Sequence, residues 1–327
     1  MDVYIPARAG VGQIWLAGPK GGDGSGPSDL ERAILRTLLY ADIFDYPLTA
    51  EEISHWAIGM RVTPAEVAEC LAASQWLAER VECADDRFSV CGRAGLAAVR
   101  AARARAAARL WPLARRYARL LGHLPFVRMV AVTGALALDN ADEKADIDLL
   151  IVTAPGRVWL ARALAVGCVY LARRDGIVLC PNYVLAETAL VHERRDLYTA
   201  HEFVQMIPLV GHALYTRMRA LNAWCEAYIP NARQPWRHEP DLAPAPAGRK
   251  IQGALEHLLG GWLGERLEAW ERRRKLRKFA PQAALPGTGA ILDERQVKGH
   301  FRDYGGPTLQ MFHERCRVHG VDEGVNT

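Results

Sequence analysis

The sequence predicts an α+β fold: a helical module, then a small sheet with helices, then a helical C-terminal region. Hydroxyl N-caps recur at three helix starts near the N-terminus. From Val127 onward the chain alternates between short apolar strands and helices, which is typical of a sheet covered by helices. Beyond residue 250 the pattern is mainly helical.

The composition is that of an ordinary globular protein. At 327 residues the chain is long enough for two or three small domains, each with its own core. Its 41 basic and 37 acidic residues give a net charge of +4, which by itself does not indicate a nucleic-acid partner. The seven cysteines lack Cys-x-x-Cys spacing, so we expect reduced thiols in a cytoplasmic protein. No apolar run reaches membrane-spanning length, and we expect no membrane partner.

The first predicted module covers residues 28–92. Ser28, Thr49 and Thr63 each stand three residues before a glutamate, which is the capping-box pattern of a helix start. The segment Arg80–Cys91 then predicts two short strands around an Asp-Asp turn. Three helices followed by a hairpin are the order of a winged helix-turn-helix, so the sequence predicts a winged-helix-like module.

The third helix of this module is poorly suited to DNA. It carries Glu66 and Glu69, with Glu79 just beyond, and almost no arginine or lysine. Contacts to DNA phosphates require cations. A packing or protein-contact role is therefore favoured over DNA binding.

The remaining predicted segments follow in chain order. Residues 93–125 are predicted to form a connecting helix whose charged residues are nearly all arginine. We favour the interpretation that these arginines form a solvated face. The alternative is that they form a basic face near the phosphates of a bound nucleotide or RNA. The predicted boundaries are a flexible Gly-rich start over 1–27, a sheet domain over 126–229, a Pro-rich linker over 230–249 and a helical region over 250–327. Within the sheet domain we expect strands at Val127–Thr133, Ile147–Thr153 and Ile177–Leu185, and helices at Gly156–Arg174, Thr199–Leu209 and Ala213–Tyr228.

The most informative stretch is Val132–Thr153. It reads as an apolar strand, a tight turn at Gly134, a polar excursion, and a strand that begins with Asp146-Ile-Asp148. Alternate side chains of a strand share one face, so the two carboxylates would lie about 7 Å apart on the same side. Mg²⁺ prefers such carboxylates together with substrate phosphates, and a glycine turn offers backbone N–H groups to a polyphosphate. The alternative is a solvated strand face, but the four apolar residues after Asp148 favour a strand buried except at one end.

This stretch resembles the signature of the nucleotidyltransferase-fold superfamily, to which DNA polymerase β and the aminoglycoside nucleotidyltransferases belong. That signature is a strand, Gly-Ser, a short spacer, and Asp-hydrophobic-Asp-hydrophobic. The chain also resembles bacterial and archaeal nucleotidyltransferase-domain proteins with an N-terminal winged-helix-like part. The segments that carry this second resemblance are Leu38–Thr49, Cys180–Tyr183, Tyr198–Glu202, and Asn222 and Trp224 with Pro230 and Asn231.

The resemblance implies a polymerase β-like sheet and a role for each residue that matches the signature. Asp146 and Asp148 would be catalytic and would bind Mg²⁺ or Mn²⁺. The residues implied in binding the nucleotide are Thr133, Gly134, Ala135 and Asn140. The implied partners are a nucleoside triphosphate and an unidentified acceptor, which is a small molecule, an RNA or a protein.

The sequence departs from the signature at two positions. Ala135 replaces the serine, which removes one hydroxyl donor to phosphate. Asn182 stands at the position where the superfamily has a third acid that activates the attacking hydroxyl. An amide cannot act as a base at neutral pH. Glu187 and Asp139 are alternative acids, and His201 and Glu202 are further candidates for which a capping or core role is equally open. Two functions therefore remain: a Mg²⁺-dependent transfer of a nucleoside monophosphate, or a degenerate nucleotide sensor or DNA-binding regulatory protein.

Overall fold

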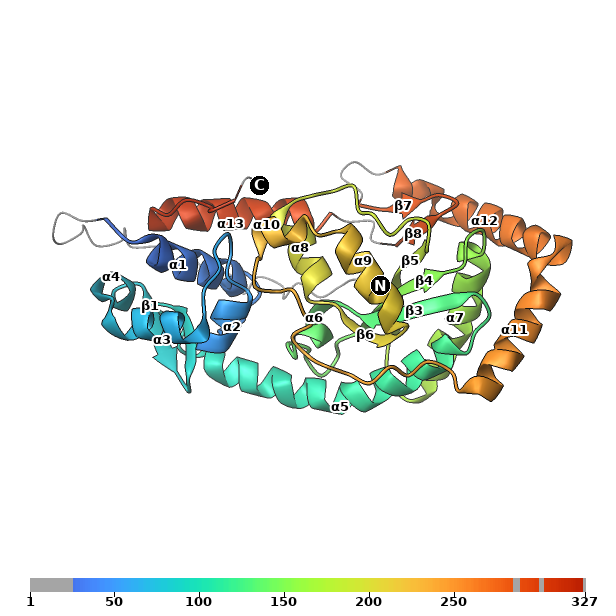
Figure 1. Ribbon diagram of the computed structural model, residues 1–327, viewed down its shortest axis with the longest axis horizontal. Coiled ribbons are helices and arrows are strands. Elements are labelled where there is room, and N and C mark those ends of the chain that lie inside the picture. The colour runs from blue at the N-terminus through green and yellow to red at the C-terminus, as the bar shows by residue number, and fades with distance from the viewer. Residues whose placement is uncertain (1–25, 285–288, 300–302, 326–327) are drawn as a thin grey trace.

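The computed structural model describes residues 26–284, 289–299 and 303–325. It is a mixed α+β structure in which a six-stranded mixed sheet lies between an N-terminal module and helices from the C-terminal part of the chain (Figure 1). Nearly all of the Gly-rich start that the sequence predicts over 1–27 lies outside the described residues.

The N-terminal module has the order of elements that the sequence predicts. All three capping boxes are present, with Ser28, Thr49 and Thr63 each accepting from the backbone N–H of a glutamate whose side chain reaches back. Asp85 and Asp86 both have positive φ, as a two-residue hairpin turn requires. A short helix before the hairpin was not predicted. The elements are α1 (Asp29–Asp42), α2 (Ala50–His55), α3 (Pro64–Ala73), α4 (Gln75–Ala78), β1 (Val81–Ala84) and β2 (Arg87–Val90).

The long helix α5 (Leu96–Gly122) connects this module to the sheet, along the lower edge of Figure 1. Its arginines bind carboxylates of the protein itself. At the module end Arg100 is buried, donates to Glu52 at 2.6 Å and lies over the ring of Tyr46. Further pairs are Arg109–Glu143, Arg115–Glu239 and Arg116–Asp175. These paired arginines are therefore engaged within the protein, which favours the structural role over a phosphate-binding face.

The central sheet has the strand order β6-β3-β4-β5-β8-β7. Strand β3 pairs antiparallel with β4, and β4 pairs parallel with β5 through the crossover helix α7. The order strand, strand, helix, strand is the one that the sequence predicts. The observed bounds of β4 are those predicted from the sequence. These elements are β3 (Val127–Val132), α6 (Gly134–Ala137), β4 (Ile147–Thr153), α7 (Val158–Arg174) and β5 (Leu179–Ala186).

Helices cover both faces of the sheet, because residues of β4 alternate between two hydrophobic clusters. Leu149 and Ile151 pack with α5 and α7, whereas Leu150 and Val152 pack with α8, α9 and the N-terminal module. By the same alternation, Asp148 points to the face that α8 covers. The elements on that side are α8 (Leu197–Val204), α9 (His212–Leu221), α10 (Cys225–Tyr228) and α13 (Gly305–His319).

For the later part of the chain one expectation was wrong, and the expected helical C-terminal region is confirmed for most of its residues. The helix expected over Thr199–Leu209 ends at Val204, and β6 (Ile207–Val210) follows as an edge strand beside β3. The C-terminal part is not purely helical, since β7 (Ile291–Leu292) and β8 (Gln296–Lys298) extend the sheet from β5. Both strands depend on pairing with distant residues, which local periodicity does not report. The other elements are α11 (Pro246–Gly260) and α12 (Trp262–Ala283).

The Pro-rich segment before α11 packs against the rest of the protein. Asp241 accepts from the backbone N–H groups of Gly211 and His212 at the start of α9. Glu239 is buried between Arg115 and Arg237. In the described part of the chain, no helix is both long and apolar enough to cross a bilayer.

The buried pair between Arg100 and Glu52 gives a first prediction. Removing one member of a buried ion pair leaves an uncompensated charge, so Arg100→Ala should lower the free energy of unfolding by about 3 kcal/mol or more. Arg109→Ala breaks the pair with Glu143, in which both side chains are largely exposed, and should cost less than about 1 kcal/mol. Urea denaturation of both variants measures the difference. Equal losses would contradict the assigned role of Arg100.

Candidate functional site

Asp148 occupies a buried position near the start of β4. Only 7% of its surface is exposed, and no salt bridge to it is found among the described residues. Its backbone carbonyl accepts from the N–H of Thr133, which extends the β3–β4 pairing up to the turn. The sheet thus fixes this carboxylate beside the loop that contains Gly134.

Gly134 is required at the turn for two reasons. Its φ is +64°, a conformation that favours glycine. A Cβ at this position would stand 2.6 Å from Oδ2 of Asp148, which is far inside van der Waals contact. Glycine therefore brings the loop backbone directly against the carboxylate.

Asn182 lies on the other side of Asp148. The pairing of β4 with β5 moves from Leu149–Pro181 to Leu150–Tyr183, so Asn182 is an extra residue in a bulge. Its Nδ2 donates to Oδ1 of Asp148 at 2.5 Å. Its Oδ1 accepts from the Cys180 thiol at 2.8 Å. Asn182 is therefore a hydrogen-bonding bridge to Asp148 rather than a base.

The environment makes Asp148 hard to ionise in the free protein. Burial raises its pKa to about 7, and the negative charge of Asp146 adds to the effect, while the hydrogen bond from Asn182 opposes it. Asp146 stands just before β4 and is half-buried, and its own pKa is raised by burial and by Asp142. Two acids that interact and resist ionisation form a site that a cation would stabilise.

Two further charged residues face this region, and sequence analysis identified only one. Glu202 on α8, a candidate from the sequence, also raises the pKa of Asp148. Lys298 on β8 was not predicted; it pairs in register with Tyr183, the residue after Asn182. Burial lowers the pKa of Lys298, and the charge of Glu202 opposes that shift. No local signal could have placed Lys298 here, because only the return of β8 beside β5 does so.

Other predicted nucleotide-binding residues have different surroundings. Thr133 and Ala135 flank Gly134, and Ala135 is exposed. The side chain of Asn140 instead contacts the N-terminal module: its Nδ2 donates to the carbonyl of Phe44, and its Oδ1 accepts from Arg103. The structure therefore does not bring Asn140 to Asp148.

Three of the further candidates also lie outside the site. Glu187 follows β5 at the opposite end of the β4–β5 pair, about 20 Å from Asp148 along the strand at the usual rise per residue. Asp139 accepts from the indole of Trp111 and pairs with Arg237. His201 stacks on Tyr40 with ring centroids 4.1 Å apart, and burial lowers its pKa to about 3.

The donor set fits a cation that arrives with its substrate. Among the residues described, no cluster of three or more His, Cys, Asp or Glu side chains could hold a metal ion alone. Mg²⁺ commonly uses one or two carboxylates and completes its shell with phosphates and water. Asp146 and Asp148 meet that requirement for Mg²⁺ or Mn²⁺.

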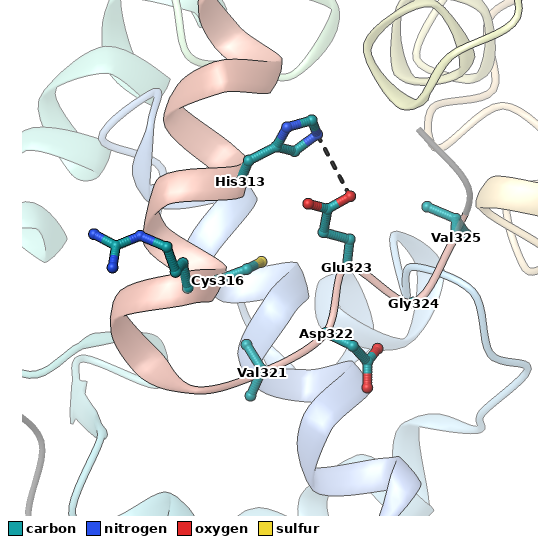
Figure 2. Close-up of a pocket in the computed structure, with 8 residues that line it drawn as sticks. His313, Cys316, Val321, Asp322, Glu323, Gly324 and Val325 are labelled. Carbon is teal, nitrogen blue, oxygen red and sulfur yellow. Dashed lines mark ion pairs between the residues drawn. The ribbon is translucent and has the colours of Figure 1, made fainter.

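An open hollow lies elsewhere in the described part of the chain. A hollow of about 660 Å³ lies at the C-terminal end of α13 and is lined by residues between His313 and Val325. Figure 2 shows His313 facing Glu323 across it, at 3.5 Å between Nε2 and Oε2. None of its lining residues belongs to the sheet, so this hollow is separate from the acids at the start of β4.

Comparison with known proteins adds no family. No protein-family model matches the sequence, and neither a curated protein nor a solved structure matches the chain.

The raised pKa of Asp148 gives a second prediction. The folded chain holds a proton there between about pH 4 and pH 7, where the unfolded chain has released it. The contribution of Asp148 to stability therefore falls as pH rises through this window. Asp148→Asn removes the charge and keeps an oxygen to accept from Asn182. Without divalent ions, we expect this variant to be more stable than the wild type at pH 8 by about 1–3 kcal/mol, and similar at pH 4.

Urea denaturation at several pH values measures this difference. The control is Glu143→Gln, at an exposed position, which should show no such pH dependence. Equal destabilisation of Asp148→Asn at both pH values would show that Asp148 stabilises the fold as an ordinary hydrogen-bonded carboxylate.

Proposed function

We propose that this chain is a Mg²⁺-dependent nucleotidyltransferase that moves a nucleoside monophosphate from a triphosphate to an acceptor. The observation that carries the proposal is the contact between Gly134 and the buried carboxylate of Asp148. Burying a carboxylate without a cationic partner costs free energy, and such carboxylates are typical of sites that bind a ligand. The order β3–turn–β4 with Asp146 and Asp148 supports a polymerase β-like fold, and the helix–hairpin order of residues 28–92 supports a winged-helix-like module.

In this proposal each residue has a defined task. Asp146 and Asp148 would hold Mg²⁺, which when bound would supply positive charge to the phosphates. The N–H groups at the start of α6 have no acceptor within the helix, and Thr133 does not cap them, so they are available to phosphate oxygens. Lys298 supplies positive charge, and Asn182 fixes the orientation of Asp148.

The reaction is a displacement at the α-phosphorus. A bond forms between the acceptor atom and phosphorus, the bond to the bridging oxygen breaks, and pyrophosphate leaves with the electron pair. Asn182 cannot take a proton from the acceptor. The site therefore favours an acceptor that is already ionised at neutral pH, such as a phosphate or carboxylate group.

A second candidate function is nucleotide sensing without turnover. It is favoured by Asn182, whose amide hydrogen-bonds both Asp148 and Cys180 and stands at the position where the signature has a third acid. A DNA-binding regulator is less favoured, because α3 presents Glu66 and Glu69 and carries no lysine or arginine.

Metal-dependent pyrophosphate release tests the enzyme. With each of the four common nucleoside triphosphates and Mg²⁺, Asp146→Asn and Asp148→Asn should each lower release at least 100-fold relative to the wild type. Glu187→Gln is the matched control, since it changes an acid at the far end of the same strand pair and should leave release unchanged. Release that is unaffected by Asp148→Asn would refute the proposed enzyme. Saturable nucleotide binding without release would instead support the sensor.

A further inference from the structure

Helix α11 has its apolar side turned away from the protein. Gln252 donates to three backbone carbonyls between Gly122 and Val127, and Glu256 accepts from the N–H of Phe126 and pairs with Arg128. The inner side of the helix is thus mainly polar, and its apolar contact is Leu259, which packs against Phe126, Leu160 and Ala161. Its outer side carries Ile251, Leu255 and Leu258, of which Ile251 and Leu258 are 65% and 66% exposed. A helix that buries its polar side and exposes its apolar side reverses the usual pattern.

Helix α12 continues the same arrangement. Glu268 points inward and accepts from the backbone N–H groups of Trp159 and Leu160. The outward side carries Trp262 and Trp270, which are 69% and 55% exposed, together with exposed leucines. We call the exposed side chains of α11 and α12 the outer face; its large apolar members are Ile251, Leu255, Leu258, Trp262, Leu263, Leu267 and Trp270.

The outer face is also strongly basic. Glu256 and Glu268 are directed to the protein, so their charge is removed from this side. The buried Glu271 instead pairs with Arg274 and Lys275 of α12 itself. Guanidinium groups lie over both exposed tryptophans, Arg266 over Trp262 and Arg274 over Trp270. The exposed charged residues are Arg249, Lys250, Arg266, Arg273, Arg274, Arg277 and Lys278, against Glu265 alone, which gives seven positive charges, one negative charge and a net +6 among exposed side chains. Because the buried Glu271 pairs with Arg274, the net charge is +5 when that glutamate is included.

We propose that the outer face of α11 and α12 docks on the surface of an anionic phospholipid bilayer. Helices that lie in a membrane interface combine leucine and tryptophan on one side with arginine and lysine around them. The long basic side chains can keep their charges at the lipid phosphates while their stems cover apolar surface. This association needs no spanning helix, and it places the membrane at the end of the molecule opposite the N-terminal module (Figure 1).

Other occupants fit less well. A second copy of the chain would bring two positively charged faces together, which is repulsive. A single-stranded nucleic acid would use the tryptophans for base stacking, but it offers no partner for Ile251, Leu255 and Leu258. A lipid surface satisfies the apolar side chains and the charge at once.

Vesicle sedimentation with the full chain tests the proposal. At low ionic strength we expect the wild type to bind vesicles of phosphatidylcholine with phosphatidylglycerol, and to bind pure phosphatidylcholine at least tenfold more weakly. Leu258→Ser with Trp262→Ser, and separately Arg273→Gln with Arg277→Gln, should each weaken binding to the anionic vesicles at least fivefold. All four positions are exposed, so thermal melting should be nearly unchanged.

The matched control is Val99→Ser with Leu221→Ser, two exposed apolar residues on α5 and α9, which should bind as the wild type does. Failure of the wild type to sediment with anionic vesicles would overturn the proposal. Two other results would also overturn it. One is a concentration-dependent dimer that the Leu258 and Trp262 changes abolish while vesicle binding persists. The other is binding of a single-stranded oligonucleotide that is lost in the same way while vesicle binding persists. Pyrophosphate release does not enter this test, so the proposed enzyme can fail independently.

Discussion

The central constraint in this protein is a carboxylate that the fold buries without a salt bridge to any of the described residues. Asp148 is fixed by its place in β4, contacted by the backbone at Gly134 and bridged by Asn182 to a neighbouring thiol. These contacts define its orientation, yet burial keeps its pKa near 7. The protein thereby maintains an acid that is unfavourable in the free state. A divalent ion bound with a triphosphate would relieve that cost, which connects stability to function.

The N-terminal module is joined to the site through α8. Glu202 on this helix influences Asp148, while its neighbour His201 stacks on Tyr40 of α1. The buried pair of Arg100 and Glu52 fixes the module to α5, which also packs against β3. A change in the packing of the N-terminal module would therefore move α8, and α8 carries Glu202, whose charge acts on Asp148. This physical connection is what a nucleotide sensor would need, and an enzyme could use it for regulation.

The sequence predicted the parts of the fold that are encoded locally. The capping boxes at Ser28, Thr49 and Thr63 and the bounds of β4 follow from short-range patterns, and so does the position of Asp148. Pairing between distant segments was not predictable: β6 was taken for the end of a helix, and the return of β8 with Lys298 had no local signal. The sequence shows that Asn182 stands where the signature has an acid. Its hydrogen bonds to Asp148 and Cys180 depend on the bulge in β5, which the sequence does not reveal directly. Pro181, which has no N–H for the ladder, was the one hint of that bulge.

Divalent-ion binding tests the central claim most directly. Titration of Mn²⁺ followed by electron paramagnetic resonance, with and without a non-hydrolysable nucleoside triphosphate, would measure whether the acidic pair and a nucleotide share one ion. We expect the protein alone to bind Mn²⁺ weakly. Protein and nucleotide together should bind Mn²⁺ at least tenfold more tightly than the nucleotide alone. Asp148→Asn should abolish that difference. Ion binding that is the same in the wild type and in Asp148→Asn would contradict the central claim.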